Sequence, residues 1–153
     1  MHSDAVLAID AAQGDRAAFA GLVARHQGAL RAYCRRLAPG AEDFGDDIAQ
    51  EALVRAWTSL SQLADPARFR PWLFRIAWRC FLQQTRRRKP AFAPGGNDDE
   101  TETIHGAPST DRDVALARVD LERALARLKP EERAAITLCL SYGHSHGEAA
   151  DML

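Results

Sequence analysis

The sequence lacks the features of a secreted or membrane-bound protein. Its three cysteines, Cys34, Cys80 and Cys139, are odd in number and widely separated, which argues against a disulfide framework and a CxxC metal site. No apolar run approaches the roughly 20 residues that cross a bilayer, and the N-terminus lacks a basic segment followed by an apolar one. We therefore expect a cytoplasmic protein without membrane insertion, in which each cysteine is a small buried apolar residue.

The sequence also lacks strand-like alternation of apolar and polar residues, and it contains no internal repeat. Apolar residues instead recur three and four positions apart, so we expect an all-α fold. Gly14-Asp15, Pro39-Gly40 and Gly143 mark helix boundaries, and Ser145 with Glu148 has the spacing of a capping box. Helices are expected over residues 5–12, 15–37, 46–60, 69–87, 114–128 and 131–142, and from Ser145 onward.

Charge is unevenly distributed, although the net charge is only −1. Residues 1–90 carry 14 Lys and Arg against 9 Asp and Glu, a charge of +5, whereas residues 91–153 carry 6 against 12, a charge of −6. The two halves should therefore have different partners. Residues 90–111 are rich in Pro, Gly, Asp and Ser/Thr and show no periodicity, so we expect a flexible linker there.

One predicted helix, over residues 46–60, carries short polar side chains on neighbouring faces. Residues three and four apart on a helix lie above one another, which groups Asp47, Gln50, Glu51 and Val54 into a surface that we call the acidic ridge. Carboxylates and amides on a rigid helix can pair with basic side chains of a protein partner, and Val54 adds apolar contact. The alternative is a face that only water contacts.

The next predicted helix is aromatic and basic, and no carboxylate occurs between Pro66 and Asn97. Arginines hold phosphates, and flat side chains hold bases that have left the stack, so this helix suits a nucleic acid. Trp78 could equally be a core residue, and the run from Arg86 to Lys89 could be only a helix end. The expected core stripe is Trp72, Leu73, Ile76, Ala77 and Cys80. The residues expected nearer the exposed side are Arg70, Phe74, Arg75, Trp78, Arg79 and Arg86.

The order of these elements resembles bacterial sigma factors of the extracytoplasmic-function (ECF) type, and the resemblance covers nearly the whole chain. It rests on four motifs in sequence order. They are Gly14-Asp15 through Phe19, Asp47-Ile-x-Gln50-Glu51 with Trp57, Phe69-Arg70-x-Trp72-Leu73 with Arg75-Ile76-Ala77, and Leu125 through Arg133.

The resemblance implies a non-enzymatic transcription initiation factor that binds core RNA polymerase and needs no cofactor. It implies a sigma region 2 domain over residues 1–89, a linker over 90–111 and a partial region 4 domain over 112–153. An anti-sigma factor is a further expected partner. The residues expected to dock on the clamp helices of the largest polymerase subunit are Asp47, Gln50, Glu51, Val54 and Arg55.

The same resemblance assigns promoter recognition and melting to the aromatic and basic helix. The target is the non-template strand of the −10 promoter element, and the preceding loop, residues 60–68, would receive a flipped base. Relatives often have Arg at the position of Trp78 and Asn at that of Arg79, so the promoter sequence does not carry over. The residues expected to bind DNA are Arg68, Arg70, Phe74, Arg75, Trp78, Arg79, Arg86, Arg87 and Arg88.

The C-terminal segment departs from the family pattern. The sequence stops at Leu153, inside the expected first helix of a helix-turn-helix, so the recognition helix is absent from it. Either a truncation or a naturally short variant would explain this. The remaining segment leaves Leu and Ile without their usual partner helix, so we expect it to be partly disordered or paired with another chain.

Other functions fit parts of the sequence. A metal-dependent nuclease could use Asp46, Asp47 and Glu51, although these carboxylates share one helix surface. Cys139, His144 and His146 could bind zinc, although a fourth ligand is missing. A partner-switching sigma mimic, which binds an anti-sigma factor without directing transcription, is the remaining alternative. The aromatic and basic helix argues against it, and the missing recognition helix argues for it.

Overall fold

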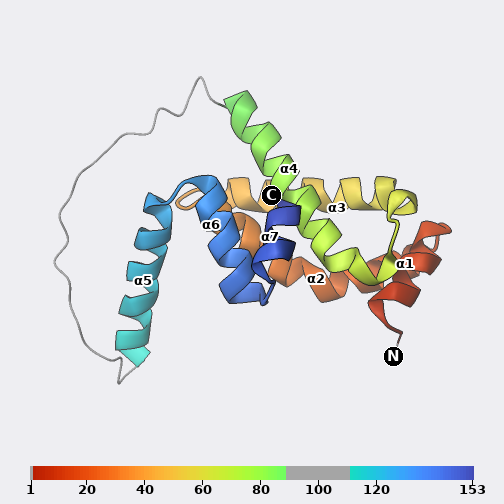
Figure 1. Ribbon diagram of the computed structural model, residues 1–153, viewed down its shortest axis with the longest axis horizontal. Coiled ribbons are helices and arrows are strands. Elements are labelled where there is room, and N and C mark those ends of the chain that lie inside the picture. Colours follow the sequence, from red (N-terminus) through yellow and green to blue (C-terminus); the bar gives the residue numbers. More distant parts are fainter. Residues whose placement is uncertain (1, 89–110) are drawn as a thin grey trace.

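The computed structural model describes residues 2–88 and 111–153, and every regular element in those ranges is helical (Figure 1). The prediction of an all-α fold is therefore confirmed. The long elements are α1 (Asp4–Ala12), α2 (Arg16–Leu37), α3 (Glu42–Ser59), α4 (Phe69–Arg88), α5 (Asp111–Arg127), α6 (Pro130–Ile136) and α7 (His146–Met152). The short turns η1 (Leu60–Gln62) and η2 (Pro66–Arg68) join α3 to α4, and the π-helical segment η3 (Thr137–Ser141) continues α6. None of the described helices is long and apolar enough to span a bilayer.

The predicted helix boundaries are set by local capping. Asp15 Oδ1 accepts hydrogen bonds from the backbone N–H groups of Ala17 and Ala18, at 2.8 and 3.2 Å, and so begins α2. The N–H of Glu148 donates to Ser145 Oγ at 3.2 Å, and that of Ser145 donates to Glu148 Oε2 at 2.9 Å, which completes the predicted capping box of α7. Gly143, with φ of 68°, closes the preceding helix as expected.

The start of α3 differs from the prediction, because α3 begins at Glu42 rather than at Asp46. Its first turn is acidic, which favours a helix N-terminus, but Gly45 lies within that turn and lowers its helix propensity. The reason for Gly45 is tertiary. A Cβ at this position would lie 2.7 Å from Arg35 Cα, so glycine allows the backbones of α2 and α3 to approach closely.

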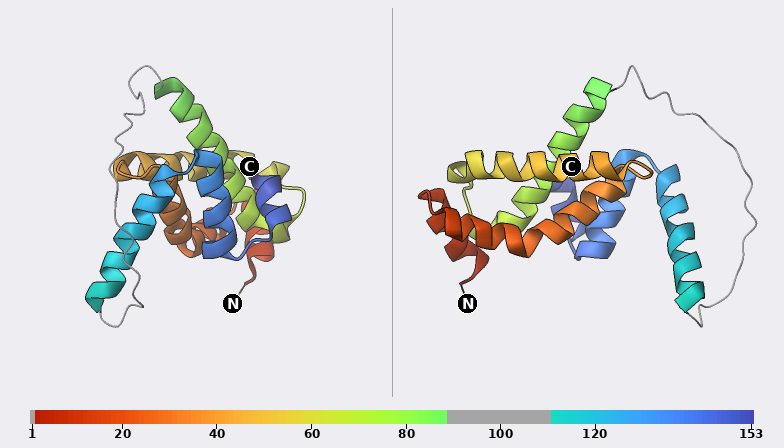
Figure 2. Two further views of the ribbon diagram at one scale, coloured as in Figure 1. Left: turned by 60° about the vertical axis from the view of Figure 1, so that its left-hand side comes forward. Right: turned by 180° about the vertical axis from the view of Figure 1, so that it is seen from behind.

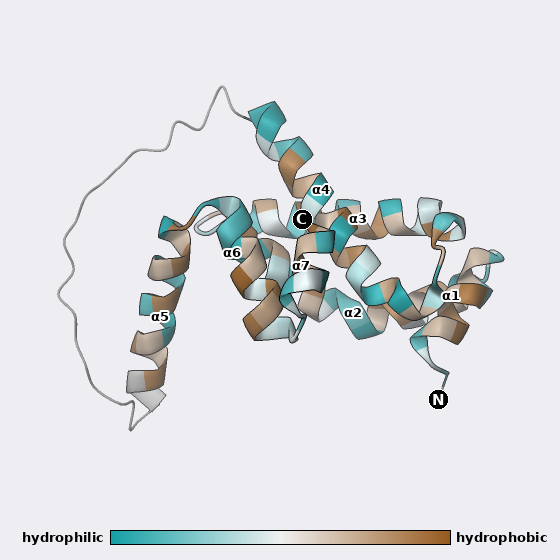
Figure 3. Ribbon diagram, viewed as in Figure 1, coloured by the Kyte–Doolittle hydropathy of each residue, from teal (hydrophilic) through white to brown (hydrophobic). Residues whose placement is uncertain are grey.

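The core lies where α2, α3 and α4 pack together, with α1 against α2 (Figure 1). Apolar colouring concentrates where these helices face one another, whereas the C-terminal end of α4 is hydrophilic (Figure 3). The cysteines Cys34 and Cys80 are buried and reduced, as predicted, and Cys139 is half-buried. The largest fully buried side chains are Trp78, Tyr33, Phe69, Phe74, Leu22, Leu30, Leu37, Ile48, Leu73 and Leu138.

The C-terminal lobe, which we define as α6, η3 and α7 with the residues to Leu153, packs against α2 and α4 of the same chain (Figures 1 and 2). Arg133 is 6% exposed, and its guanidinium donates to the Leu37 carbonyl at 2.7 Å and to those of Leu125 and Leu128 at 2.8 Å. Residues 130–153 are thus ordered on helices of their own chain, where the sequence led us to expect partial disorder or pairing with a second chain. The sequence did not reveal this intramolecular surface on α2 and α4.

Helix α5 stands apart from the other helices in all views (Figures 1 and 2). It exposes apolar side chains at Val114, Leu116, Val119 and Leu121, in agreement with the expectation of an unpartnered face. The predicted linker falls almost entirely on residues 89–110, which lie outside the described residues, and Asp111 already begins α5.

We expect Gly45→Ala to lower the free energy of unfolding by about 1–3 kcal/mol, because the new methyl group would force α2 and α3 apart. Gly28→Ala is the matched control. Gly28 also lies inside a helix, but a Cβ added there would meet no atom within 4 Å, so the change should raise stability by up to about 1 kcal/mol. Urea unfolding followed by circular dichroism measures both, and equal effects would contradict the close-approach argument.

Candidate functional site

The acidic ridge is present on the outer side of α3. Asp47 and Gln50 are exposed, Val54 is 64% exposed, and Glu51 is half-buried. Neither Asp47 nor Gln50 has a side-chain partner among the described residues. The surface predicted from helical spacing is therefore present, and its Asp47 and Gln50 side chains are available to a partner.

Arg55 joins the acidic ridge to α4. Its Nε donates to Glu51 Oε1 at 2.7 Å, and its second amino group donates to Gln83 Oε1 at 2.6 Å. These two bonds hold Glu51 in place and fix α4 against α3. Arg55, expected to contact the polymerase, thus already has two partners within the chain.

Asp46 lies at the edge of the acidic ridge, facing α2, and serves the fold. Arg35 donates to its two carboxylate oxygens through Nε and an amino group, each at 2.8 Å, and this hydrogen bonding holds the pKa of Asp46 below its usual value. Of the carboxylates considered for a nuclease, Asp46 and Glu51 are therefore held by different arginines, and Asp47 is held by none in the described part of the chain. Within residues 2–88 and 111–153, no three His, Cys, Asp or Glu side chains form a group able to hold a metal ion, so Cys139, His144 and His146 do not gather there.

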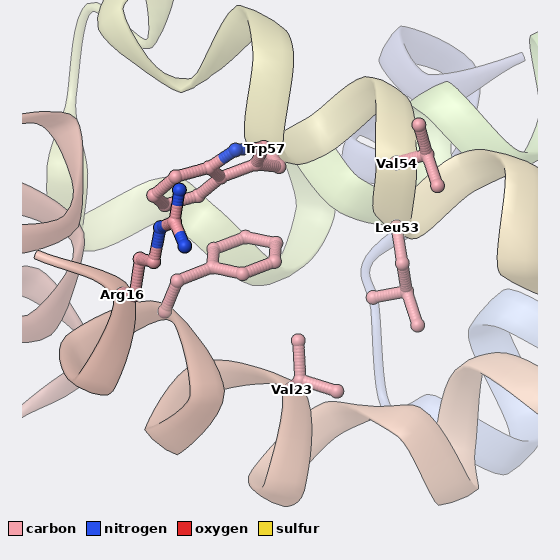
Figure 4. Close-up of a pocket in the computed structure, with 6 residues that line it drawn as sticks. Arg16, Val23, Leu53, Val54 and Trp57 are labelled. Atoms are coloured by element: carbon pink, nitrogen blue, oxygen red, sulfur yellow. The ribbon is translucent and has the colours of Figure 1, made fainter. Parts of the chain in front are cut away.

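An apolar groove continues the acidic ridge toward α2 (Figure 4). Phe19 and Val23 of α2 face Leu53, Val54 and Trp57 of α3 across it, and the Phe19 and Trp57 rings lie 4.9 Å apart. Arg16 lies at its edge. Phe19 and Trp57 belong to sequence motifs that do not predict this groove, because which faces of two helices border one groove depends on their packing. Since Val54 belongs to both, the ridge and the groove form one continuous surface.

Helix α4 exposes a basic stripe. Arg75 and Arg79, one turn apart, are exposed, and so are Arg68 in η2 and the three arginines at the end of α4, Arg86, Arg87 and Arg88. The Arg88 guanidinium lies 4.0 Å from the centroid of the Phe44 ring, which anchors that side chain to α3. Arg70 is half-buried, with its guanidinium 5.6 Å from the Tyr142 ring. Most of the predicted cations therefore face solvent on one helix and the turn before it.

The predicted exposure of Phe74 and Trp78 is wrong. Phe74 is 0% and Trp78 is 2% exposed. The Phe74 ring lies 5.1 Å from both Tyr33 of α2 and Tyr142 of the C-terminal lobe. Trp78 Nε1 donates to the Leu153 carbonyl at 3.1 Å. Both rings are buried because the C-terminal lobe covers this side of α4, a contact between segments that are far apart in sequence.

His144 lies within that contact, and its ring centroid is 6.3 Å from that of Phe74. Burial lowers its pKa below 6.5, the positive charge of Arg70 on α4 lowers it further, and Glu148 on α7 acts in the opposite direction. Its Nε2 atom is buried without a hydrogen-bond partner in the described part of the chain. The contact therefore favours the neutral imidazole.

Known proteins are similar to this chain in sequence and in fold. The family described as Sigma-70 region 2 matches residues 22–90, which include most of α2 and all of α3 and α4. The RNA polymerase sigma factor NccH of Alcaligenes xylosoxydans xylosoxydans is 38% identical over 96% of this chain and 81% of its own length. The ECF RNA polymerase sigma factor SigL of Mycobacterium tuberculosis is 32% identical over 92% of this chain and 78% of its own. A solved structure of CnrH in complex with the cytosolic domain of CnrY is 32% identical, with a TM-score of 0.65 over 97% of this chain and 81% of that one.

We expect stability to fall more in the wild type than in His144→Gln as the pH is lowered from about 7.5 to about 5.5. The pKa of His144 is below 6.5 in the fold, so the unfolded chain binds the proton first. The stabilising contribution is complete above pH 6.5 and decreases below it. Urea unfolding at each pH measures the effect. The other four histidines are common to both proteins, so parallel curves would contradict the role of His144.

Proposed function

Because this chain belongs to the ECF sigma factors of RNA polymerase, we propose that its acidic ridge binds the core enzyme and that α4 binds promoter DNA. It is a transcription initiation factor whose partners are core polymerase and promoter DNA. We infer that it acts in the cytoplasm, without a cofactor and without an enzymatic activity of its own. Its division into region 2 over residues 1–89, a linker over 90–111 and a partial region 4 over 112–153 belongs to the same proposal.

The observation that carries the polymerase assignment is the continuity of the acidic ridge with the apolar groove. Asp47 and Gln50 offer unpaired polar groups, and Val54 leads directly into the groove beside Trp57. Stable protein interfaces combine an apolar centre with a polar rim, and this surface has both. The proposed occupant is the two-helix clamp of the largest polymerase subunit, whose basic side chains would pair with Asp47 and Glu51.

Arg55 acts from behind this surface in the proposed complex. Its bonds to Glu51 and Gln83 orient the Glu51 carboxylate and keep α3 in register with α4. It is therefore a positioning residue for docking rather than a direct contact.

The DNA assignment is supported by the basic stripe of α4. Arg75 and Arg79 are exposed without ion-pair partners among the described residues, and cations of this kind bind phosphates. The end of α4 adds three further arginines, and η2 adds Arg68 on the N-terminal side. The target is the non-template strand of the −10 element. In this role the arginines of the stripe hold the phosphates of that DNA strand. Recognition of its bases needs aromatic rings or pockets nearby.

A partner that inhibits the factor is part of the proposal. The solved relative CnrH is bound to the cytosolic domain of CnrY, which supports regulation of this chain by an anti-sigma factor. A sigma mimic that binds only such a partner is less well supported, because the chain keeps an exposed basic stripe on α4 and an accessible acidic ridge on α3.

We expect Asp47→Ala combined with Gln50→Ala to weaken binding of core polymerase by about tenfold or more, the loss of roughly 1.4 kcal/mol or more of contact energy. Fluorescence anisotropy with labelled protein and core enzyme from the source bacterium measures the affinity. Asp10→Ala combined with Gln13→Ala removes the same two residue types from α1 and its C-cap and should leave the affinity unchanged. Equal affinities of all three proteins would refute the docking surface.

We expect Arg75→Ala combined with Arg79→Ala to keep core binding and to lose promoter opening, because two phosphate contacts disappear. Permanganate footprinting with holoenzyme measures opening on genomic fragments that the wild-type holoenzyme transcribes in vitro. Arg118→Ala combined with Arg123→Ala on α5 removes equal charge from another helix and should retain opening. If the α4 variant opened promoters as well as the α5 variant, α4 would not be the DNA-binding helix.

A further inference from the structure

The end of α4 lies against the first turn of α3 through one aromatic side chain, Phe44. The centroid of its ring is 4.0 Å from the Arg88 guanidinium and 6.4 Å from the centroid of the Phe81 ring. Phe81 and Arg88 are seven residues apart on α4, so they lie on the same face of that helix, about two turns apart. Phe44 therefore lies beside both a buried ring of α4 and the last residue of that helix.

Arg88 differs from the two arginines that precede it. Arg86 and Arg87 are exposed, and they have no ring, carboxylate or carbonyl partner among the described residues. Arg88 is exposed as well, but its guanidinium is held on the Phe44 ring. A side chain that is already ordered loses less conformational entropy on binding a ligand than a freely moving one. Of the three arginines at this helix end, Arg88 is therefore the one that is preorganised for a contact.

The ring holds Arg88 in a way that leaves its hydrogen-bond donors free. A guanidinium that stacks on a ring uses its flat face, and its N–H groups point outward along the edge. The side chain shares a hollow with three carboxylates, those of Glu42, Asp43 and Asp47, but it forms no ion pair with any of them. A carboxylate partner would occupy the donors that a phosphate needs. The Phe44 ring instead leaves these donors available.

We propose that Phe44 is a positioning residue for DNA binding, which holds Arg88 at the end of α4 with its donors free for a phosphate of the bound strand. This inference rests on the proposed DNA-binding function of α4. It gives α3 a part in DNA binding, although Phe44 itself contacts no DNA. The three arginines at the end of α4 then differ in their roles, because Arg86 and Arg87 attract the strand and Arg88 fixes its path.

The test measures the affinity of preassembled holoenzyme, with core polymerase in excess, for a genomic promoter fragment that the wild-type holoenzyme transcribes in vitro. Fluorescence anisotropy at several KCl concentrations gives the affinity and its salt dependence. Arg88→Ala removes a phosphate contact, so it should weaken binding about fivefold and reduce the slope of log affinity against log salt concentration by about 1. Phe44→Leu keeps an apolar side chain beside Phe81 but removes the aromatic face. It should weaken binding about threefold, as expected for an exposed cation–π contact.

A double-mutant cycle separates positioning of Arg88 from packing of the two helices. If Phe44 acts through Arg88, adding Phe44→Leu to Arg88→Ala should cause no further loss of affinity. Arg87→Ala is the matched control background. Phe44→Leu should cause its full threefold loss there, because Arg87 has no contact with the ring. Phe44→Tyr keeps an aromatic face and should restore the wild-type affinity.

Three results would overturn the positioning role. They are an equal loss from Phe44→Leu in the Arg88→Ala and Arg87→Ala backgrounds, no loss from Phe44→Leu in the wild type, and a Phe44→Tyr variant as weak as Phe44→Leu. The first of these is the pattern that a purely structural role of the ring would give, since destabilised packing would weaken both backgrounds alike.

Failure of the proposed DNA-binding function gives a different pattern. If neither Arg88→Ala nor Arg75→Ala with Arg79→Ala weakened promoter binding, α4 would not be the DNA-binding helix. If the pair of Arg75 and Arg79 mattered and Arg88 did not, α4 would keep its function and only the positioning role of Phe44 would be overturned.

Discussion

The close packing of α2 against α3 at Gly45 is the constraint on which the other features depend. The backbone contact there, with the bidentate pair of Arg35 and Asp46 beside it, sets the rotation of α3. That rotation turns Asp46 toward the arginines of α2 and leaves Asp47 and Gln50 exposed, and it brings Val54 and Trp57 to the groove beside Phe19. If α3 were shifted by one residue, Asp47 would take the place of Asp46 beside Arg35, and the exposed carboxylate would be lost from the ridge. The surface that we propose for the polymerase is thus a consequence of how two helices meet.

Helix α4 carries cationic and aromatic side chains that differ in their exposure to solvent. Most of its arginines are exposed, whereas the Phe74 and Trp78 rings are buried between the core and the C-terminal lobe. Electrostatic attraction acts over distances up to about 10 Å, but stacking needs direct contact. The exposed cations can therefore attract a polyanion from a distance, whereas the buried rings are not available for stacking in this conformation.

The sequence predicted most of the fold because its signals are local. Asp15, Gly143 and the Ser145–Glu148 pair act within a few residues, and the spacing of Asp47, Gln50 and Val54 follows from helix geometry alone. Features that depend on tertiary packing were missed. Gly45 looks unfavourable for a helix until α2 lies against it, and Trp78 looks exposed until Leu153 and its neighbours cover it. The groove beside Val54 likewise exists only after two helices are placed.

The bridge made by Arg55 has a thermodynamic consequence. One guanidinium serves both Glu51, on the surface that we propose for the polymerase, and Gln83, on the helix that we propose for DNA. A ligand that draws Glu51 toward itself changes the strength of the bond to Gln83, and by linkage a change at Gln83 alters the affinity for that ligand equally. The two surfaces therefore share a coupling free energy. If both proposed surfaces are used, binding of the enzyme would alter the response of this factor to DNA through this bridge.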